Sequence, residues 1–269
     1  MQQLTKGTYL GRNVLERRFS GLIISENQYQ PDFSSEWHYH QNPYFALILR
    51  GGSLERRKKE NIECLPGHLL YYNCQEPHKN EKYCKGSKNF SVEFEDEWFT
   101  NFCIDRNRLQ GNMLIQNPAL KTLFLKMLFA FKYEDLQLEM NIESLILQTF
   151  SFLLKDHKDY RIAPKWLMEV KDYLHETSQQ KISLPDLAKQ FDVHPVTISK
   201  LFPHFFHCTL GEYTRKIKIE KALHLLTKKN MALEIISYEC GFADHAHFTR
   251  MFKKYTSFTP AQYRAFLFR

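Results

Sequence analysis

The chain has 269 residues, of which 43% are hydrophobic and 25% are charged, and its formal net charge is +7. This composition excludes a chain that is disordered over most of its length, and it indicates about two globular domains. Neither an apolar run of about 18 residues nor an apolar signal-peptide core occurs, so we expect a cytoplasmic protein that has no membrane partner.

Residues 1 to about 105 predict β structure. Short runs rich in aromatic and branched residues stand between turns that contain glycine or proline, which is the pattern of strands joined by short loops. The runs are Gly21–Ser25, Phe45–Leu49, Leu69–Tyr72 and Phe90–Phe94, and the turns contain Gly51-Gly52, Pro66-Gly67 and Lys85-Gly86. Many short strands at this spacing favour a barrel or a sandwich.

Two helices are predicted between residues 118 and 155. Pro118 suits the first position of a helix, and apolar residues from Leu120 to Phe131 recur at helical spacing. A second apolar run extends from Leu145 to Leu154. Because both helices have a broad apolar face, they either cover the barrel or form a dimer contact. The polar segment that follows has no apolar period, and we interpret residues 156–163 as a linker.

The residues from 164 onward contain an internal repeat about fifty residues long. One copy is Ser183–Tyr213 and the other is Ala232–Tyr263. Each copy predicts two short helices around a tight turn, which is the helix-turn-helix arrangement. Gly241 supplies a positive φ in the second turn, at the place where Asp192 stands in the first.

Local signals support the helices of both copies. Ser183 and Asp186 are expected to form a capping pair, and Asp244 is expected to cap the last helix of the second copy. Between the copies, residues 210–228 follow a long amphipathic pattern that predicts a rigid spacer helix. Such a spacer suits two readers of successive major grooves, which lie about 34 Å apart on one face of DNA.

The second helix of each copy has the outer face that a DNA reader needs, with side chains able to meet bases and phosphates. The predicted DNA-binding residues are Val196, Thr197, Ser199, Lys200 and His204 in the first copy and His245, Ala246, His247, Thr249, Arg250, Lys253 and Lys254 in the second. Residues 163–269 hold 16 Lys and Arg against 10 Asp and Glu, which is nearly all of the positive excess. Arg250 is expected to read guanine, and the two lysines to contact phosphates. The alternative is a bundle of two helical hairpins with a solvated basic face.

Three stretches of the second copy carry a family resemblance. They are Cys240-Gly241-Phe242-Ala243-Asp244, Phe248-Thr249-Arg250-Met251-Phe252-Lys253-Lys254, and Thr259-Pro260 followed by Tyr263-Arg264. In these residues the chain resembles the AraC/XylS family of bacterial regulators, over roughly Pro164 to Phe268. The resemblance implies a double-stranded DNA partner and regulation of promoters, usually activation. RNA polymerase, a small-molecule effector and a second copy of the chain are the other partners expected.

The chain departs from the family pattern at three positions. His207 and Ser257 stand where the family usually has glycine after each recognition helix. Pro203 lies inside the first recognition helix, where proline removes a hydrogen bond and favours a kink. These departures concern the first reader more than the second.

The N-terminal part resembles a degenerate cupin barrel, from His38-Tyr39-His40, Gly51, Pro66-Gly67 and Pro77-His78. Metal-binding cupins add a glutamate, and here its position falls near Tyr44 or Phe45. Three neutral imidazoles can still hold zinc or iron. The favoured prediction is a small-molecule pocket without a metal or other cofactor, walled by aromatic residues. The predicted ligand-binding residues are His38, His40, Tyr44, Tyr72 and His78, with Trp37 as a further wall.

The predicted fold therefore has two domains. Residues 1–155 form an all-β cupin-like barrel, a double-stranded β-helix, with two covering helices at about 118–155. After the linker at 156–163, residues 164–269 form an all-α domain of two helix-turn-helix units joined by a long helix.

The predicted function is sequence-specific binding of DNA by a transcription regulator that is not an enzyme, and the resemblance implies an activator that responds to a small molecule. One alternative is a metal-dependent cupin enzyme with a helical appendage. The missing glutamate argues against it, and the tandem repeat has no role in it. An alkyl-transfer repair protein needs a metal-bound cysteine cluster, and the six cysteines form no CxxC pair.

Overall fold

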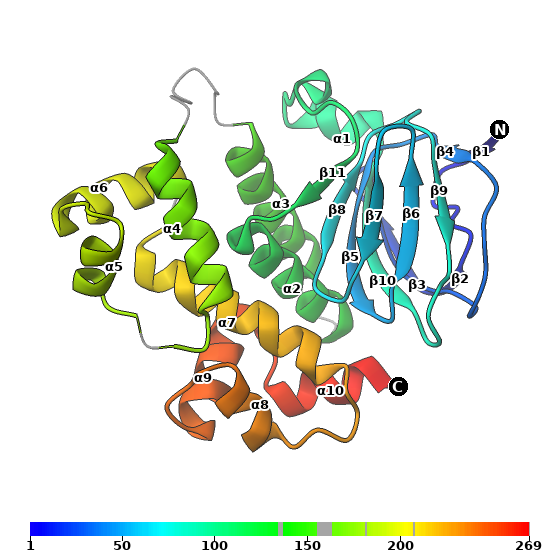
Figure 1. The fold of residues 1–269 in the computed structure, drawn as a ribbon. Coiled ribbons are helices and arrows are strands. Elements are labelled where there is room, and N and C mark those ends of the chain that lie inside the picture. Colours follow the sequence, from blue (N-terminus) through cyan, green and yellow to red (C-terminus); the bar gives the residue numbers. More distant parts are fainter. Residues whose placement is uncertain (134–136, 155–162, 181, 207, 269) are drawn as a thin grey trace. The chain divides into compact units, whose positions relative to one another are not determined.

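The computed structural model describes residues 1–133, 137–154, 163–180, 182–206 and 208–268, and it divides into two compact units (Figure 1). The sheet unit consists of Met1–Gln116 and Ala130–Leu154, and the helical unit consists of Asn117–Phe129 and Lys155–Arg269. The division falls inside helix α2 (Pro118–Tyr133). The predicted linker, except for its last residue, lies outside the described residues. None of the described helices is long and apolar enough to span a bilayer.

The sheet unit contains two sheets that lie face to face (Figure 1). In spatial order, the five-stranded sheet consists of β1 (Gln2–Leu4), β4 (His38–His40), β9 (His78–Glu81), β6 (Ser53–Arg57) and β7 (Asn61–Cys64). The six-stranded sheet consists of β11 (Met113–Ile115), β8 (Leu69–Tyr72), β5 (Tyr44–Arg50), β10 (Lys88–Phe94), β3 (Leu22–Gln28) and β2 (Arg12–Phe19). The four predicted runs fall on β3, β5, β8 and β10, which hold the long buried stretches of the sheet unit. The other strands are not among the predicted runs.

Strand β5 shows how the core between the sheets is built. Its alternate residues Tyr44, Ala46 and Ile48 point into a buried cluster. That cluster is completed by Ile62 and Cys64 of the opposite sheet, with Leu70 and Tyr72 of β8. The residues between them point to the other face, which is buried as well. This explains why the sequence of β5 is continuously apolar rather than alternating.

Helix α3 (Leu138–Leu153) packs on the six-stranded sheet. The ring of Phe150 lies edge-on to Phe45 and Phe94, at centroid distances of 6.1 and 5.3 Å. The same ring contacts Trp98 of α1 (Asp96–Asn101), a helix the sequence did not predict. In the last turn of α2, Phe131 packs against Phe90. The sequence left open whether these helices cover the barrel or form a dimer contact. The contacts of Phe131 and Phe150 are those of helices that cover the sheet. A one-turn 3-10 helix, η1, follows α1 at Arg106–Arg108.

The helical unit contains the two predicted repeats. Its helices are α4 (Lys165–Glu176), α5 (Leu184–Gln190), α6 (Pro195–Phe206), α7 (Leu210–Leu226), α8 (Leu233–Glu239), α9 (His245–Thr256) and α10 (Pro260–Phe268). The first part of α2 also belongs to this unit. There, Lys121 donates a hydrogen bond to Glu220 of α7, and Phe129 packs edge-on against Phe258.

The two helix-turn-helix units have the same backbone design. In the first turn the amide of Val193 donates to the carbonyl of Ala188, and in the second the amide of Phe242 donates to that of Ser237. These bonds close the C-termini of α5 and α8 around a residue with positive φ, Asp192 at 50° and Gly241 at 69°. The second turn is one residue longer than the first, since five residues separate α8 from α9 and four separate α5 from α6.

The predicted caps are present. Ser183 and Asp186 form a reciprocal capping box at the start of α5, and the carboxylate of Asp244 accepts a hydrogen bond from the amide of His247, 2.6 Å away. Helix α6 continues through Pro203. Ser257 ends α9 with a φ of 66°, a conformation that glycine adopts more easily. His207 lies outside the described residues.

Candidate functional site

Helices α6 and α9 each present one buried face and one exposed face. Ile198 and Phe202 anchor α6, and Phe248 and Phe252 anchor α9; all four side chains are completely buried. The predicted DNA-binding residues lie on the opposite faces. The exposed ones are Val196, Thr197, Ser199, Lys200, His204, His245, Ala246, Arg250, Lys253 and Lys254, and the half-buried ones are His247 and Thr249.

The inner face of α6 belongs to a core built from four helices. Leu174 of α4, Leu187 of α5 and Tyr213 of α7 pack with Ile198 and Phe202. Burying side chains of this size stabilises the fold by about 1.5–3 kcal/mol each. This core determines which face of α6 remains in solvent.

The inner face of α9 is held by an aromatic core. The ring of Phe252 packs edge-on against Phe248 and against Tyr263 of α10. Arg215 of α7 donates a hydrogen bond from Nε to the hydroxyl of Tyr255, 3.2 Å away. Since α7 contacts both α6 and α9, the spacer helix supports both readers directly.

Two lysines of α7 bind the end of α8. Nζ of Lys218 donates a hydrogen bond to the carbonyl oxygen of Gly241, and Nζ of Lys221 donates one to the carbonyl oxygen of Glu239. The donor–acceptor distance is 2.6 Å in both. The last carbonyls of a helix lack partners in the helix and carry partial negative charge, so these bonds stabilise α8. Burial lowers the pKa of Lys218. Both lysines contribute to the basic excess of the sequence, yet they serve the fold.

The cations of the exposed faces are available to a ligand. Among the residues that the structure describes, the side chains of Lys200, Arg250, Lys253 and Lys254 form no ion pair or hydrogen bond. A free guanidinium presents a planar fork to a base edge, and free ammonium groups attract phosphates. The side chains of α9 therefore suit nucleic acid more strongly than those of α6.

The two histidines of α9 are partly held in place. The imidazole of His247 packs edge-on against Phe242, with ring centroids 5.6 Å apart. Nε2 of His245 lies 3.4 Å from the hydroxyl of Thr249, one turn further along the helix. These contacts orient the polar groups at the N-terminus of α9.

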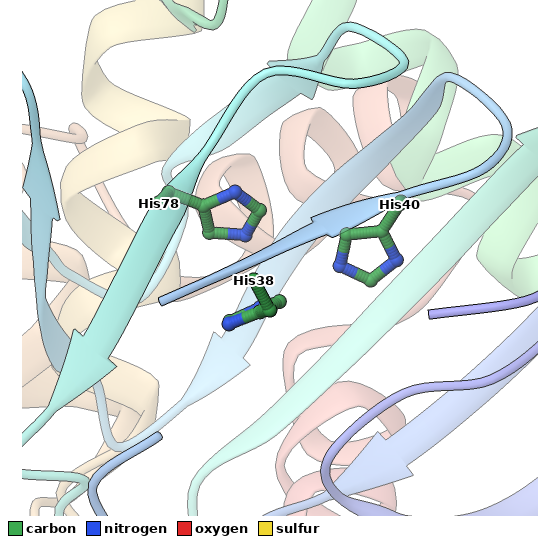
Figure 2. Close-up of side chains that lie close together, drawn as sticks. All are labelled: His38, His40 and His78. Atoms are coloured by element: carbon green, nitrogen blue, oxygen red, sulfur yellow. The ribbon is translucent and has the colours of Figure 1, made fainter. Parts of the chain in front are cut away.

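The five predicted ligand-binding residues come together inside the sheet unit. His38 and His40 of β4 and His78 of β9 face one another in Figure 2, and they are 2%, 5% and 1% exposed. The ring of Tyr72 lies 4.8 Å from that of His78, and it stacks on the ring of Tyr44 at 4.5 Å. Trp37 is 37% exposed and is not a wall of this cluster. A separate cavity of about 420 Å³ beside α1 is lined by none of these five residues.

Sequence reasoning missed the polar residues around this cluster. The carboxylate of Glu55 is completely buried, and it accepts hydrogen bonds from the hydroxyl of Tyr72 and from Nε of Arg57. Asn80 pairs with Glu55 across β9 and β6 and follows His78 by two residues, so it shares the face of that histidine. That two-residue spacing was the available signal for Asn80. Glu55 gave none, because it lies in the polar sequence Ser53–Arg57.

Comparison with known proteins identifies the helical unit. The model of a family described as a helix-turn-helix domain matches residues 187–265. The probable transcription factor PqrA of Proteus vulgaris is 35% identical over 103 residues, which cover 37% of this chain and 78% of that protein. The transcriptional activator RhaR of Mannheimia succiniciproducens is 22% identical over 263 residues, which cover 91% of this chain and 92% of RhaR.

A crystal structure of ToxT from Vibrio cholerae is 14% identical, with a TM-score of 0.39, and the match covers 92% of this chain and 98% of that one. The sequence matches to PqrA and RhaR extend over most of each relative's length. Both relatives are named as transcription regulators, and the family model covers α6 and α9, the two helices with exposed cations. The chain therefore belongs to the AraC/XylS family of DNA-binding transcription regulators and is not an enzyme.

Proposed function

We propose that α6 and α9 read two successive major grooves of one DNA duplex. The observation that carries this proposal is the pair of equally long helices, each buried along one face and polar along the other, both packed on α7. A recognition helix needs a free polar face, and a rigid support keeps two such helices at a constant separation.

The two helices contribute differently. Arg250 donates a bidentate pair of hydrogen bonds to a guanine, while Lys253 and Lys254 bind phosphates. His245, Ala246, His247 and Thr249 complete the α9 surface. On α6, Val196 is 48% exposed near the N-terminus and suits contact with a thymine methyl group. Thr197, Ser199, Lys200 and His204 surround it with hydrogen-bonding groups. With four exposed or half-exposed cationic or imidazole groups beyond Arg250, α9 provides most of the affinity.

The sheet unit is proposed as the sensory domain of this regulator. We assign residues 1–155 to a cupin-like barrel with its covering helices, 156–163 to a linker and 164–269 to the DNA-binding domain. The buried His38, His40, Tyr44, Tyr72 and His78 form the effector site. Polar groups converging inside an otherwise apolar core support this role. Relatives named as transcriptional activators support activation of transcription. We further propose that the regulator acts in the cytoplasm as a homodimer that contacts RNA polymerase.

Selection of bound DNA from a random pool, followed by hydroxyl-radical footprinting, tests the reading of two grooves. Two protected segments about one helical turn apart are expected on one face of the duplex. The Lys200→Ala variant should weaken protection of one segment and leave the other unchanged, because Lys200 lies on α6 alone. A single protected segment, or equal affinity for all sequences, would contradict the proposal.

A further inference from the structure

Three imidazoles converge from two paired strands (Figure 2). His38 and His40 are two residues apart on β4, so both side chains lie on the same face. His78 on β9 is the antiparallel partner of His38, which places its side chain on that face as well. One ring nitrogen from each histidine lies within 4.8 Å of those from the other two. No other group of three His, Cys, Asp or Glu side chains in the described residues has this geometry.

Backbone carbonyls determine which nitrogen carries the hydrogen in two of the rings. Nδ1 of His38 lies 2.9 Å from the carbonyl oxygen of Glu36, and Nδ1 of His78 lies 3.3 Å from that of Glu76. A carbonyl oxygen can only accept, so in the neutral rings Nδ1 carries the hydrogen and Nε2 carries the lone pair. Histidines that bind metals generally donate from their second nitrogen in this way, which orients the ring.

The third ring is oriented by a tyrosine. The hydroxyl of Tyr44 lies 3.3 Å from Nε2 of His40, within hydrogen-bond distance. The ring of Tyr44 is itself held by stacking on Tyr72. All three imidazoles therefore have restrained orientations before any ligand arrives.

We propose that His38, His40 and His78 bind one divalent first-row transition cation, with zinc as the expected occupant. Neutral imidazoles are preferred by Zn²⁺, Co²⁺, Ni²⁺ and Fe²⁺, whereas Mg²⁺ and Ca²⁺ prefer oxygen ligands. Nitrogens 4.8 Å apart or less can all lie within about 2.8 Å of one cation, so reaching bonds of about 2.1 Å needs ring shifts below about 1 Å.

Three protein ligands suffice, because a metal with three ligands keeps a fourth position for water or a small molecule. The sequence favoured a pocket without metal since the glutamate of metal-binding barrels is missing. The buried carboxylate of Glu55 does not replace it, because Arg57 and Tyr72 already bind both of its oxygens. The site therefore consists of neutral ligands only, which suits a cation that binds reversibly.

Zinc titration of the full-length chain, without an added histidine tag and after treatment with a chelator, tests the proposal. Calorimetry at neutral pH and elemental analysis should both give one Zn²⁺ per chain, and Mg²⁺ should not bind. His78→Ala should weaken zinc binding by more than about 100-fold, since the loss of a residue that only orients a ligand already costs about 10–100-fold. His224→Ala, at an exposed histidine of α7, is the matched control and should bind as the wild type does.

The wild type alone also decides the question if a variant does not fold. The imidazole nitrogen resonances of all three rings should shift with one equivalent of Zn²⁺. Substoichiometric zinc in the folded wild type, zinc binding that leaves these resonances unmoved, or undiminished binding in a folded His38→Ala/His78→Ala double variant would each overturn the proposal. DNA affinity is measured separately without metal, so loss of the zinc site would leave the DNA-binding role standing.

Discussion

Replacing Gly241 by alanine should destabilise the helical unit by about 3 kcal/mol. The residue has a φ of 69°, and a Cβ atom there would lie 2.3 Å from the carbonyl oxygen of Gln179, so backbone must move. A left-handed conformation costs an alanine about 1–2 kcal/mol, and forcing atoms into a packed site costs about 1–3 kcal/mol. The loss of glycine's flexibility in the unfolded chain returns about 0.5–1 kcal/mol.

Asp192 provides the matched control. It occupies the same place in the first turn with a φ of 50°. Asp192→Gly relieves a left-handed conformation that aspartate already tolerates, and it adds flexibility to the unfolded chain, so the two effects nearly cancel. We expect the free energy of unfolding of this variant to lie within about 0.5 kcal/mol of that of the wild type.

Urea unfolding, monitored by circular dichroism at the helical band, measures the free energy of unfolding of both variants. A loss of 3 kcal/mol in a unit of this size lowers the Tm by about 10–20 °C. Since Gly241 also accepts the hydrogen bond of Lys218, the displaced turn should weaken DNA binding through α9. Equal stability of Gly241→Ala and Asp192→Gly would refute the close approach of Gly241 to Gln179.

The other predictions concern DNA contacts and a buried acid. Arg250→Ala should reduce the free energy of binding to specific DNA by about 1–3 kcal/mol and relax the preference at one base position. Arg250→Lys should not restore that preference in a binding assay. An equal loss of affinity on all sequences would assign Arg250 to a phosphate contact. Lys253→Ala should reduce the slope of log affinity against log salt by about one, whereas Lys165→Ala, at an exposed side chain of α4, should leave the slope unchanged. An unchanged slope for Lys253→Ala would contradict a phosphate contact. Burial raises the pKa of Glu93, so its ionised form costs stability above pH 4.5 and protonation relieves that cost as pH falls. The free energy of unfolding of the wild type should therefore rise relative to that of Glu93→Gln as the pH is lowered from neutral toward 4.5. A difference between the two proteins that does not change with pH would contradict the raised pKa.

The helix-turn-helix repeat was predictable because its signals are local. The apolar stripes of α6 and α9, the capping residues Ser183 and Asp244, and the glycine at the second turn all act within a few residues of chain. In the sheet unit, only the apolar strands were predictable. Strands β4, β6 and β9 carry inward-facing polar residues such as His38 and Glu55, so their composition resembles that of loops.

The cupin resemblance implies that His38 and His40 lie on one strand, and residues two apart on a strand share a face. Only the tertiary structure placed His78 opposite His38, because strand register depends on pairing between segments distant in the chain. The same distinction separates the basic residues of the helical unit. The sequence determined their number, but the packing of α7 against α8 decided that Lys218 and Lys221 bind carbonyls, because a long side chain binds whichever partner the fold brings within reach. Arg250 has no such partner among the residues that the structure describes.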